Sequence, residues 1–185
     1  MIVLAFDTSA AHCAVAVQRG DTVLASQHEA MARGQAERLV PMIKATLGDA
    51  SIALSDVDRI GVGTGPGNFT GLRIAVATAR GLALALGVPA IGVTAFDAIE
   101  SIKDRPGRPM VPAPRGQGYL LDETTGAPFL ASENDLRDMD PSAPLLTLLL
   151  MPSTENSTKA SASWKSGWPG GGLGPIAHNF VHGGA

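Results

Sequence analysis

The stretch GVGTGPGNFTGLR, residues 61–73, places glycine at every second position before apolar and basic residues return. Gly65 and Gly67 permit positive φ or a close backbone approach, and Asn68 or Thr70 can cap a helix that follows. The amino end of such a helix favours an anion. The residues alone leave two interpretations open, an anion cradle and a tight structural turn.

The loop matches neither common nucleotide motif. It lacks the Gly-Lys-Ser/Thr ending of a Walker A loop, so it provides no lysine for a β- or γ-phosphate. Its glycine spacing differs from the dinucleotide fingerprint, and no acidic residue follows about twenty positions later. Arg73 ends the stretch, where an anion and a helix-end carbonyl are equally reasonable partners.

Working outward from the loop, the pattern of apolar residues predicts one α/β lobe of alternating elements. Expected strands cover residues 2–6, 13–18, 22–26, 59–63 and 89–93. Expected helices cover 35–47, the Ala-rich segment from Leu72 to Leu86, and a segment starting at Thr94, a good N-cap with Asp97 in the capping-box position. Pro41 is expected in the first turn of its helix or at a kink.

The chain beyond residue 100 has a different composition. It contains ten of the thirteen prolines, and the periodic signal fades after residues 116–121. The apolar run 144–151 predicts one buried strand or helix, and the Ser/Gly/Pro-rich end predicts loop or disorder. We therefore expect a first lobe at 1–103, a partial second lobe at 104–151 and a tail at 152–185.

Bulk properties exclude several classes of protein. A net charge of −3 with 17% charged residues indicates no general basic surface for nucleic acid. The single cysteine, Cys13, rules out an internal disulfide and is expected in the core. The start lacks the basic region and the longer apolar stretch that a signal peptide is expected to have, and no run approaches the roughly 18 apolar residues of a membrane span. These features predict a cytoplasmic protein without membrane contact.

Polar residues follow the first expected strand directly. Asp7, Thr8 and Ser9 are the types that place a carboxylate near a metal and hydroxyls near phosphate oxygens. The simpler interpretation is that Asp7 and Ser9 satisfy turn amides. Neither interpretation is excluded by the residues themselves.

The histidines give no local catalytic or metal motif. His178 and His182 have i, i+4 spacing, but they lie among glycines without a nearby carboxylate. His12 and His28 are isolated in sequence and are expected to be surface or packed residues. No nucleophile and base order is suggested, so we expect no catalytic residue and no metal ligand in this chain.

The glycine stretch, together with LAFDTSAAHCAVAV (4–17), GQAERLVPMI (34–43), ALGVPAIGVTAFDAI (85–99) and PRGQGYL (114–120), resembles the bacterial TsaB family, also called YeaZ. The resemblance covers about residues 1–120. It implies the actin-like ATPase (ASKHA, ribonuclease H-like) fold, shared with the TsaD/Kae1 family once labelled M22 glycoproteases.

The resemblance also implies a role in forming N6-threonylcarbamoyladenosine at position 37 of tRNAs that read codons beginning with A. In that pathway TsaD transfers the threonylcarbamoyl group, with help from TsaB and the ATPase TsaE. The implied role of this chain is a non-catalytic platform that dimerises when alone. ATP and a metal belong to the partner subunits, no cofactor is expected on this chain, and tRNA is contacted through the complex.

The site residues implied in this way fall into two groups. Nucleotide or anion contacts would involve Asp7, Thr8, Ser9, Gly65, Gly67, Asn68, Thr70 and Arg73. A partner interface on the helices would involve Leu39, Ile43, Ala75 and Ala79. An actin-like ATPase or an M22-type peptidase remains the alternative function.

Departures from the family pattern concentrate in the second part of the chain. The catalytic relative carries a His-x-x-x-His pair on the first long helix, where this chain reads GQAERLVP without histidine. The family motif D-x-R-x-G-E-V-Y is replaced by PAPRGQGYL, and no family pattern is evident beyond Leu121. A truncated, frame-shifted or divergent second lobe is therefore expected.

Overall fold

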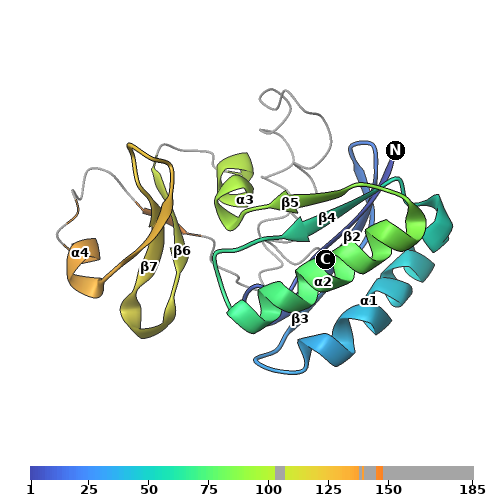
Figure 1. Cartoon of the computed structure of the whole chain (residues 1–185), viewed down its shortest axis with the longest axis horizontal. Helices are drawn as coiled ribbons and strands as arrows, with labels where there is room; N and C mark the ends of the chain where they lie inside the picture. Colours follow the sequence, from blue (N-terminus) through green and yellow to red (C-terminus); the bar gives the residue numbers. More distant parts are fainter. Residues whose placement is uncertain (103–106, 138, 140–144, 148–185) are drawn as a thin grey trace.

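A computed structural model describes residues 1–102, 107–137, 139 and 145–147 of the chain. Its larger sheet has the strand order β3-β2-β1-β4-β5 (Figure 1). The first three strands pair antiparallel, whereas β4 pairs parallel with both β1 and β5. The strands are β1 (Ile2–Asp7), β2 (His12–Arg19), β3 (Thr22–Ala30), β4 (Arg59–Gly63) and β5 (Ala90–Val93).

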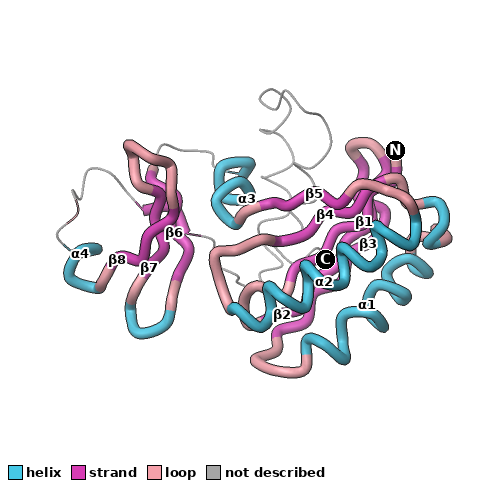
Figure 2. Tube along the Cα trace, in the orientation of Figure 1, coloured by secondary structure: helices cyan, strands magenta, loops and turns pink. Residues whose placement is uncertain are grey.

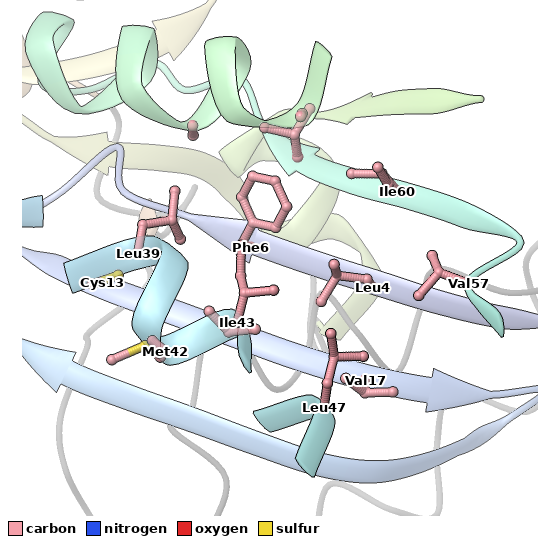
Figure 3. Packing of buried hydrophobic residues seen from close by; sticks show 14 of the residues in the cluster. Leu4, Phe6, Cys13, Val17, Leu39, Met42, Ile43, Leu47, Val57 and Ile60 are labelled. Carbon is pink, nitrogen blue, oxygen red and sulfur yellow. The ribbon is translucent and has the colours of Figure 1, made fainter. Parts of the chain in front are cut away.

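Helices α1 (Gln35–Asp49) and α2 (Phe69–Leu86) contact each other and the sheet. Apolar side chains from both helices and from β1, β2 and β4 form one core cluster, part of which is shown in Figure 3. Leu4, Phe6 and Leu39 are fully buried there. Complete burial of such a side chain contributes about 1.5–3 kcal/mol, so this layer provides much of the stability of the lobe.

The elements of this lobe confirm the sequence pattern, including the cap of α3 (Ala95–Ile102). The Thr94 amide donates to Asp97 at 2.8 Å, and the Asp97 amide donates to the Thr94 hydroxyl at 3.0 Å. Of the two positions expected for Pro41, the first turn is wrong, because Pro41 lies inside α1 beyond that turn. The helix continues through Pro41, which is exposed on the face away from the core.

A second, four-stranded sheet has the order β8-β7-β6-β9 (Figure 2). It comprises β6 (Arg108–Pro112), β7 (Gly118–Leu121), β8 (Pro128–Ala131) and β9 (Leu145–Thr147), with the short helix α4 (Glu133–Arg137) after β8. Two 3-10 turns, Leu54–Asp56 and Pro114–Gly116, complete the described elements.

Regular structure therefore continues past Leu121, where the sequence analysis found no family pattern. Periodicity is weak here because the strands have only three to five residues. In the apolar run 144–151, residues 145–147 form a strand and the rest lie outside the described residues. The predicted boundary at 103/104 and the tail 152–185 also lie outside them.

Helix α2 differs from its expected character. Its 18 residues have a mean hydropathy of 1.4, long and apolar enough to cross a membrane by length and composition. By composition this segment passes the test for a span, although it is no uninterrupted apolar run, because Arg73 and Arg80 lie within it. Ala75 and Ala79 nevertheless pack in the core cluster of the sheet, and core helices of globular proteins commonly pass the same test.

Candidate functional site

The carboxyl end of β1 carries a compact group of hydrogen bonds around Asp7. One carboxylate oxygen, Oδ1, accepts the Ser9 amide at 2.7 Å. The other, Oδ2, accepts the Ser9 hydroxyl at 2.9 Å and lies 3.2 Å from Nε2 of His12. The carboxylate thus closes the turn between β1 and β2, as the simpler interpretation of the sequence predicted.

The surroundings of Asp7 favour its charged form. Burial alone would raise the pKa of the Asp7 carboxyl, but the hydrogen bond and charge of His12 oppose this, helped by both hydrogen bonds from Ser9. The net result holds the pKa of Asp7 below its usual value. Asp7 is therefore an ionised carboxylate at neutral pH.

The glycine loop packs directly on this strand end, and three of its glycines are required by that contact. A Cβ atom at Gly63 would overlap with the Asp7 carboxylate. At Gly67 it would overlap with the carbonyl of Ser9, and at Gly71 with the carbonyl of Thr8. We call residues 7–9 packed on residues 63–71 the strand-end joint.

Hydrogen bonds fasten the strand-end joint from both sides. The Thr8 hydroxyl, which is fully buried, donates to the carbonyl of Gly71 at 2.7 Å. The backbone amide of Asn68 donates to the carbonyl of Ser9 at 2.6 Å. The Asn68 side chain caps α2 by accepting the Gly71 amide at 3.0 Å. Side chains predicted to contact an anion are thus used inside the protein.

The remaining predicted contacts lie at different places around the loop. Gly65 adopts a φ of 80°, a conformation that favours glycine, and its carbonyl accepts the Ala95 amide at 2.8 Å. Thr70 is exposed in the first turn of α2. The Arg73 guanidinium lies over the Phe69 ring, 3.8 Å from its centre, on the exposed side of the helix. The structure does not bring Arg73 to the end of β1.

The group of side chains predicted as a partner interface requires correction. Leu39, Ile43, Ala75 and Ala79 are all buried in the chain's own core, each at most 3% exposed. Helical periodicity correctly identified a shared apolar face, but that face covers the sheet (Figure 3). These four side chains are not available to a partner in this structure.

The opposite side of α2 is uncovered. Leu84 is 86% exposed and Phe69 is 65% exposed. Their spacing puts them on one face with Ala77 and Gly81, which are also exposed. We call this surface the outer face of α2; it consists of Phe69, Arg73, Ala77, Arg80, Gly81 and Leu84. It combines two large apolar side chains, small residues and two arginines.

Two histidines that appeared isolated in the sequence are neighbours in the sheet. The ring centroids of His12 and His28 are 5.2 Å apart. Partial burial and the neighbouring His12 lower the pKa of His28. Cys13 is buried in the core as expected, and burial raises the pKa of its thiol to about 11. The histidine pair could have been found in the sequence only by assuming the correct register of β2 and β3.

Comparison with known proteins places this arrangement in a family. A family model described as TsaD, tRNA N6-adenosine threonylcarbamoyltransferase, matches residues 22–122, which is more than half of the chain. An uncharacterized protein of Mycobacterium tuberculosis is 46% identical over 99 residues, covering 52% of this chain and 47% of that protein.

Two named relatives extend the comparison. The tRNA threonylcarbamoyladenosine biosynthesis protein TsaB of Escherichia coli is 39% identical over 94 residues, covering 51% of this chain and 40% of that protein. The solved structure of YeaZ from Pseudomonas aeruginosa has a TM-score of 0.58 at 35% identity, covering 71% of this chain and 64% of that chain. Like the mycobacterial match, the match to the Escherichia coli protein spans less than half of that relative's length. This chain belongs to the TsaB (YeaZ) family and has its α/β fold.

Proposed function

We propose that this chain is a non-catalytic scaffold subunit in the formation of N6-threonylcarbamoyladenosine at position 37 of tRNAs reading ANN codons. In this role it binds and supports TsaD. The names of its relatives support the pathway, and the match to the TsaD family model supports an ancestry shared with the proposed partner.

The observation that carries the proposal is the outer face of α2. A large apolar side chain such as Leu84, exposed to 86%, loses contact with water when a partner covers it. Ala77 and Gly81 lie between the large residues and allow the backbone of a second helix to approach closely. An exposed apolar surface of this kind is typical of protein interaction sites.

The strand-end joint supports the non-catalytic part of the proposal. Thr8 and Asn68 direct their side-chain polar atoms to Gly71, and Ser9 directs its hydroxyl to Asp7. These groups stabilise the fold of the lobe, so they are not free to bind a phosphate in this arrangement. Helix α1 also carries no histidine pair of the kind expected in the catalytic relative.

The proposal includes the setting in which the chain works. We place it in the cytoplasm, as a homodimer through the outer face of α2 when TsaD is absent. TsaE completes the assembly, ATP and a metal are bound by the partner subunits, and tRNA is reached through the complex.

The proposal is tested by mixing the full chain with TsaD from the same source and measuring association by sedimentation velocity, with and without ATP and TsaE. The wild-type chain is expected to bind. Leu84→Glu places a charge on the most exposed apolar residue of the outer face of α2, at its carboxyl-terminal end, so it should weaken binding at least tenfold, which is about 1.4 kcal/mol. Because Leu84 is exposed, the thermal unfolding of the Leu84→Glu variant should match that of the wild type.

Phe129→Glu provides the matched control. Phe129 is also an exposed apolar residue, at 42%, but it lies on β8 of the second sheet. This variant should bind TsaD like the wild type. A folded wild-type chain that fails to bind would remove the proposed function, and loss of binding only in Phe129→Glu would move the interface to the second sheet.

A further inference from the structure

His12 has an unusual combination of burial and free bonding capacity. Its side chain is only 5% exposed, yet Nδ1 has no hydrogen-bond partner among the residues that the structure describes. Buried polar atoms in folded proteins are almost always paired with protein, water or an ion, so an unpaired one requires an explanation. Neither the strand-end joint nor the outer face of α2 uses this nitrogen.

The other nitrogen of the ring is already engaged. Nε2 lies 3.2 Å from Oδ2 of Asp7, which positions it to donate a hydrogen to the carboxylate. In the neutral imidazole this leaves Nδ1 with an available lone pair. Histidines that bind metals commonly donate their second ring hydrogen to a carboxylate in this way. Asp7 therefore acts as a positioning residue for the His12 ring.

A second imidazole lies at a suitable distance. In the antiparallel register His12 pairs with Ala30, and His28 pairs with Ala14, so the two histidines occupy diagonal positions on one face of the sheet. Their ring centroids are 5.2 Å apart and the rings are inclined by 44°. Two imidazoles on one tetrahedral metal, with metal–nitrogen bonds of ~2.0–2.1 Å, have centroids about 5 Å apart.

We propose that His12 and His28 chelate a divalent transition-metal ion of the type that prefers imidazole, such as Zn²⁺ or Ni²⁺. His28 is exposed on the outermost strand, β3, so an ion can approach from solvent. Within the described residues no group of three or more His, Cys, Asp or Glu side chains forms a metal site. Water or a small ligand would complete the coordination on the side of His28, because Nδ1 of His12 is itself buried.

Cys13 follows His12 in sequence but takes no part. Successive residues of a strand point to opposite faces, and Cys13 belongs to the core cluster between the sheet and the helices. Of His12, Cys13 and His28, only the two histidines are therefore proposed as metal ligands. This inference is independent of the proposed role with TsaD.

The test is a Zn²⁺ titration of the full chain at pH 7.5, followed by calorimetry and by competition with a chromophoric chelator. One equivalent is expected to bind to the wild type. His28→Gln removes an exposed ligand with little risk to folding and should weaken binding at least tenfold. In ¹⁵N-edited imidazole spectra, Zn²⁺ should shift Nδ1 of His12, and this shift should require His28.

The second histidine pair of the chain supplies the control. The double variant His178→Gln/His182→Gln removes two imidazoles, one more than His28→Gln, but it leaves the proposed pair intact and should bind like the wild type. Unchanged affinity in His28→Gln, loss of binding in the double variant, or no binding by the wild type would each overturn the proposal.

Discussion

One side of α2 is packed against the rest of the protein, whereas the opposite side is exposed. At the strand-end joint the beginning of the helix meets residues 7–9 so closely that Gly71 has no room for a side chain. On the outer face, a Cβ atom at Gly81 would meet nothing within 4 Å. One side is filled by the protein itself, whereas the other is left for solvent or a partner.

This difference shows that a recognisable sequence motif need not mark a binding surface. The glycine loop has the composition of an anion cradle, but contacts with the end of β1 account for Gly63, Gly67 and Gly71. The outer face of α2 begins in the same stretch at Phe69 and continues past it to Leu84, the two most exposed large apolar residues of the described chain. The surface proposed for a partner is therefore not the one that the glycines indicate.

The largest effect on stability is expected where α2 packs against the strand-end joint. Gly71→Ala places a methyl group against the Thr8 carbonyl and should reduce the free energy of unfolding by about 3 kcal/mol or more, because backbone must move. Gly81→Ala, in the same helix, should raise it by about 0.5–1 kcal/mol through helix propensity. Urea unfolding of the two variants measures both changes; similar values for the pair would contradict the assignment of the joint.

A smaller effect is expected at the cap of α2. Asn68→Ala removes the side-chain oxygen that accepts the Gly71 amide and should cost about 1 kcal/mol. Thr70→Ala is the control, because the exposed Thr70 side chain takes no part in the hydrogen bonds described for the joint and helix propensity favours alanine. Thermal unfolding would show a lower midpoint only for Asn68→Ala, and equal midpoints would argue against the cap.

The smallest effect concerns the exposed side. Arg73→Gln removes the guanidinium that lies over Phe69, an exposed contact worth about 0.5–1 kcal/mol at most. The unfolding midpoint should fall only slightly, with Arg80→Gln as a charge-matched comparison on the same face. A loss as large as that of Gly71→Ala would mean that Arg73 supports the interior, contrary to its position here.

Much of the first lobe could be predicted from the sequence because its elements are long and strongly patterned. Leu39, Ile43 and Leu47 recur with helical spacing and are buried, whereas Val40, assigned to the same face, is 46% exposed. The capping box at Thr94 and Asp97 is entirely local, so the residues suffice to predict it. The second sheet was missed beyond Leu121 because its strands have only three to five residues, too few for a clear periodic pattern.

The site was predicted less well, for two physical reasons. Periodicity identifies the apolar face of a helix but does not say whether a sheet or another protein covers it, which is why Ala75 and Ala79 were misassigned. Contacts between strands depend on register, so the proximity of His12 and His28 is invisible in the sequence. The pairing of Thr8 with Gly71 requires the folded lobe in the same way.

The hydrogen bond between Thr8 and Gly71 also has a consequence for synthesis, because it joins residues 63 positions apart. A ribosome adding about 5–20 residues per second needs roughly 3–13 s to make that interval. During this time β1 can pair with β2, but its other edge has to wait for β4. The nascent chain therefore presents an open, apolar strand edge for several seconds, the period in which a chaperone would protect it most.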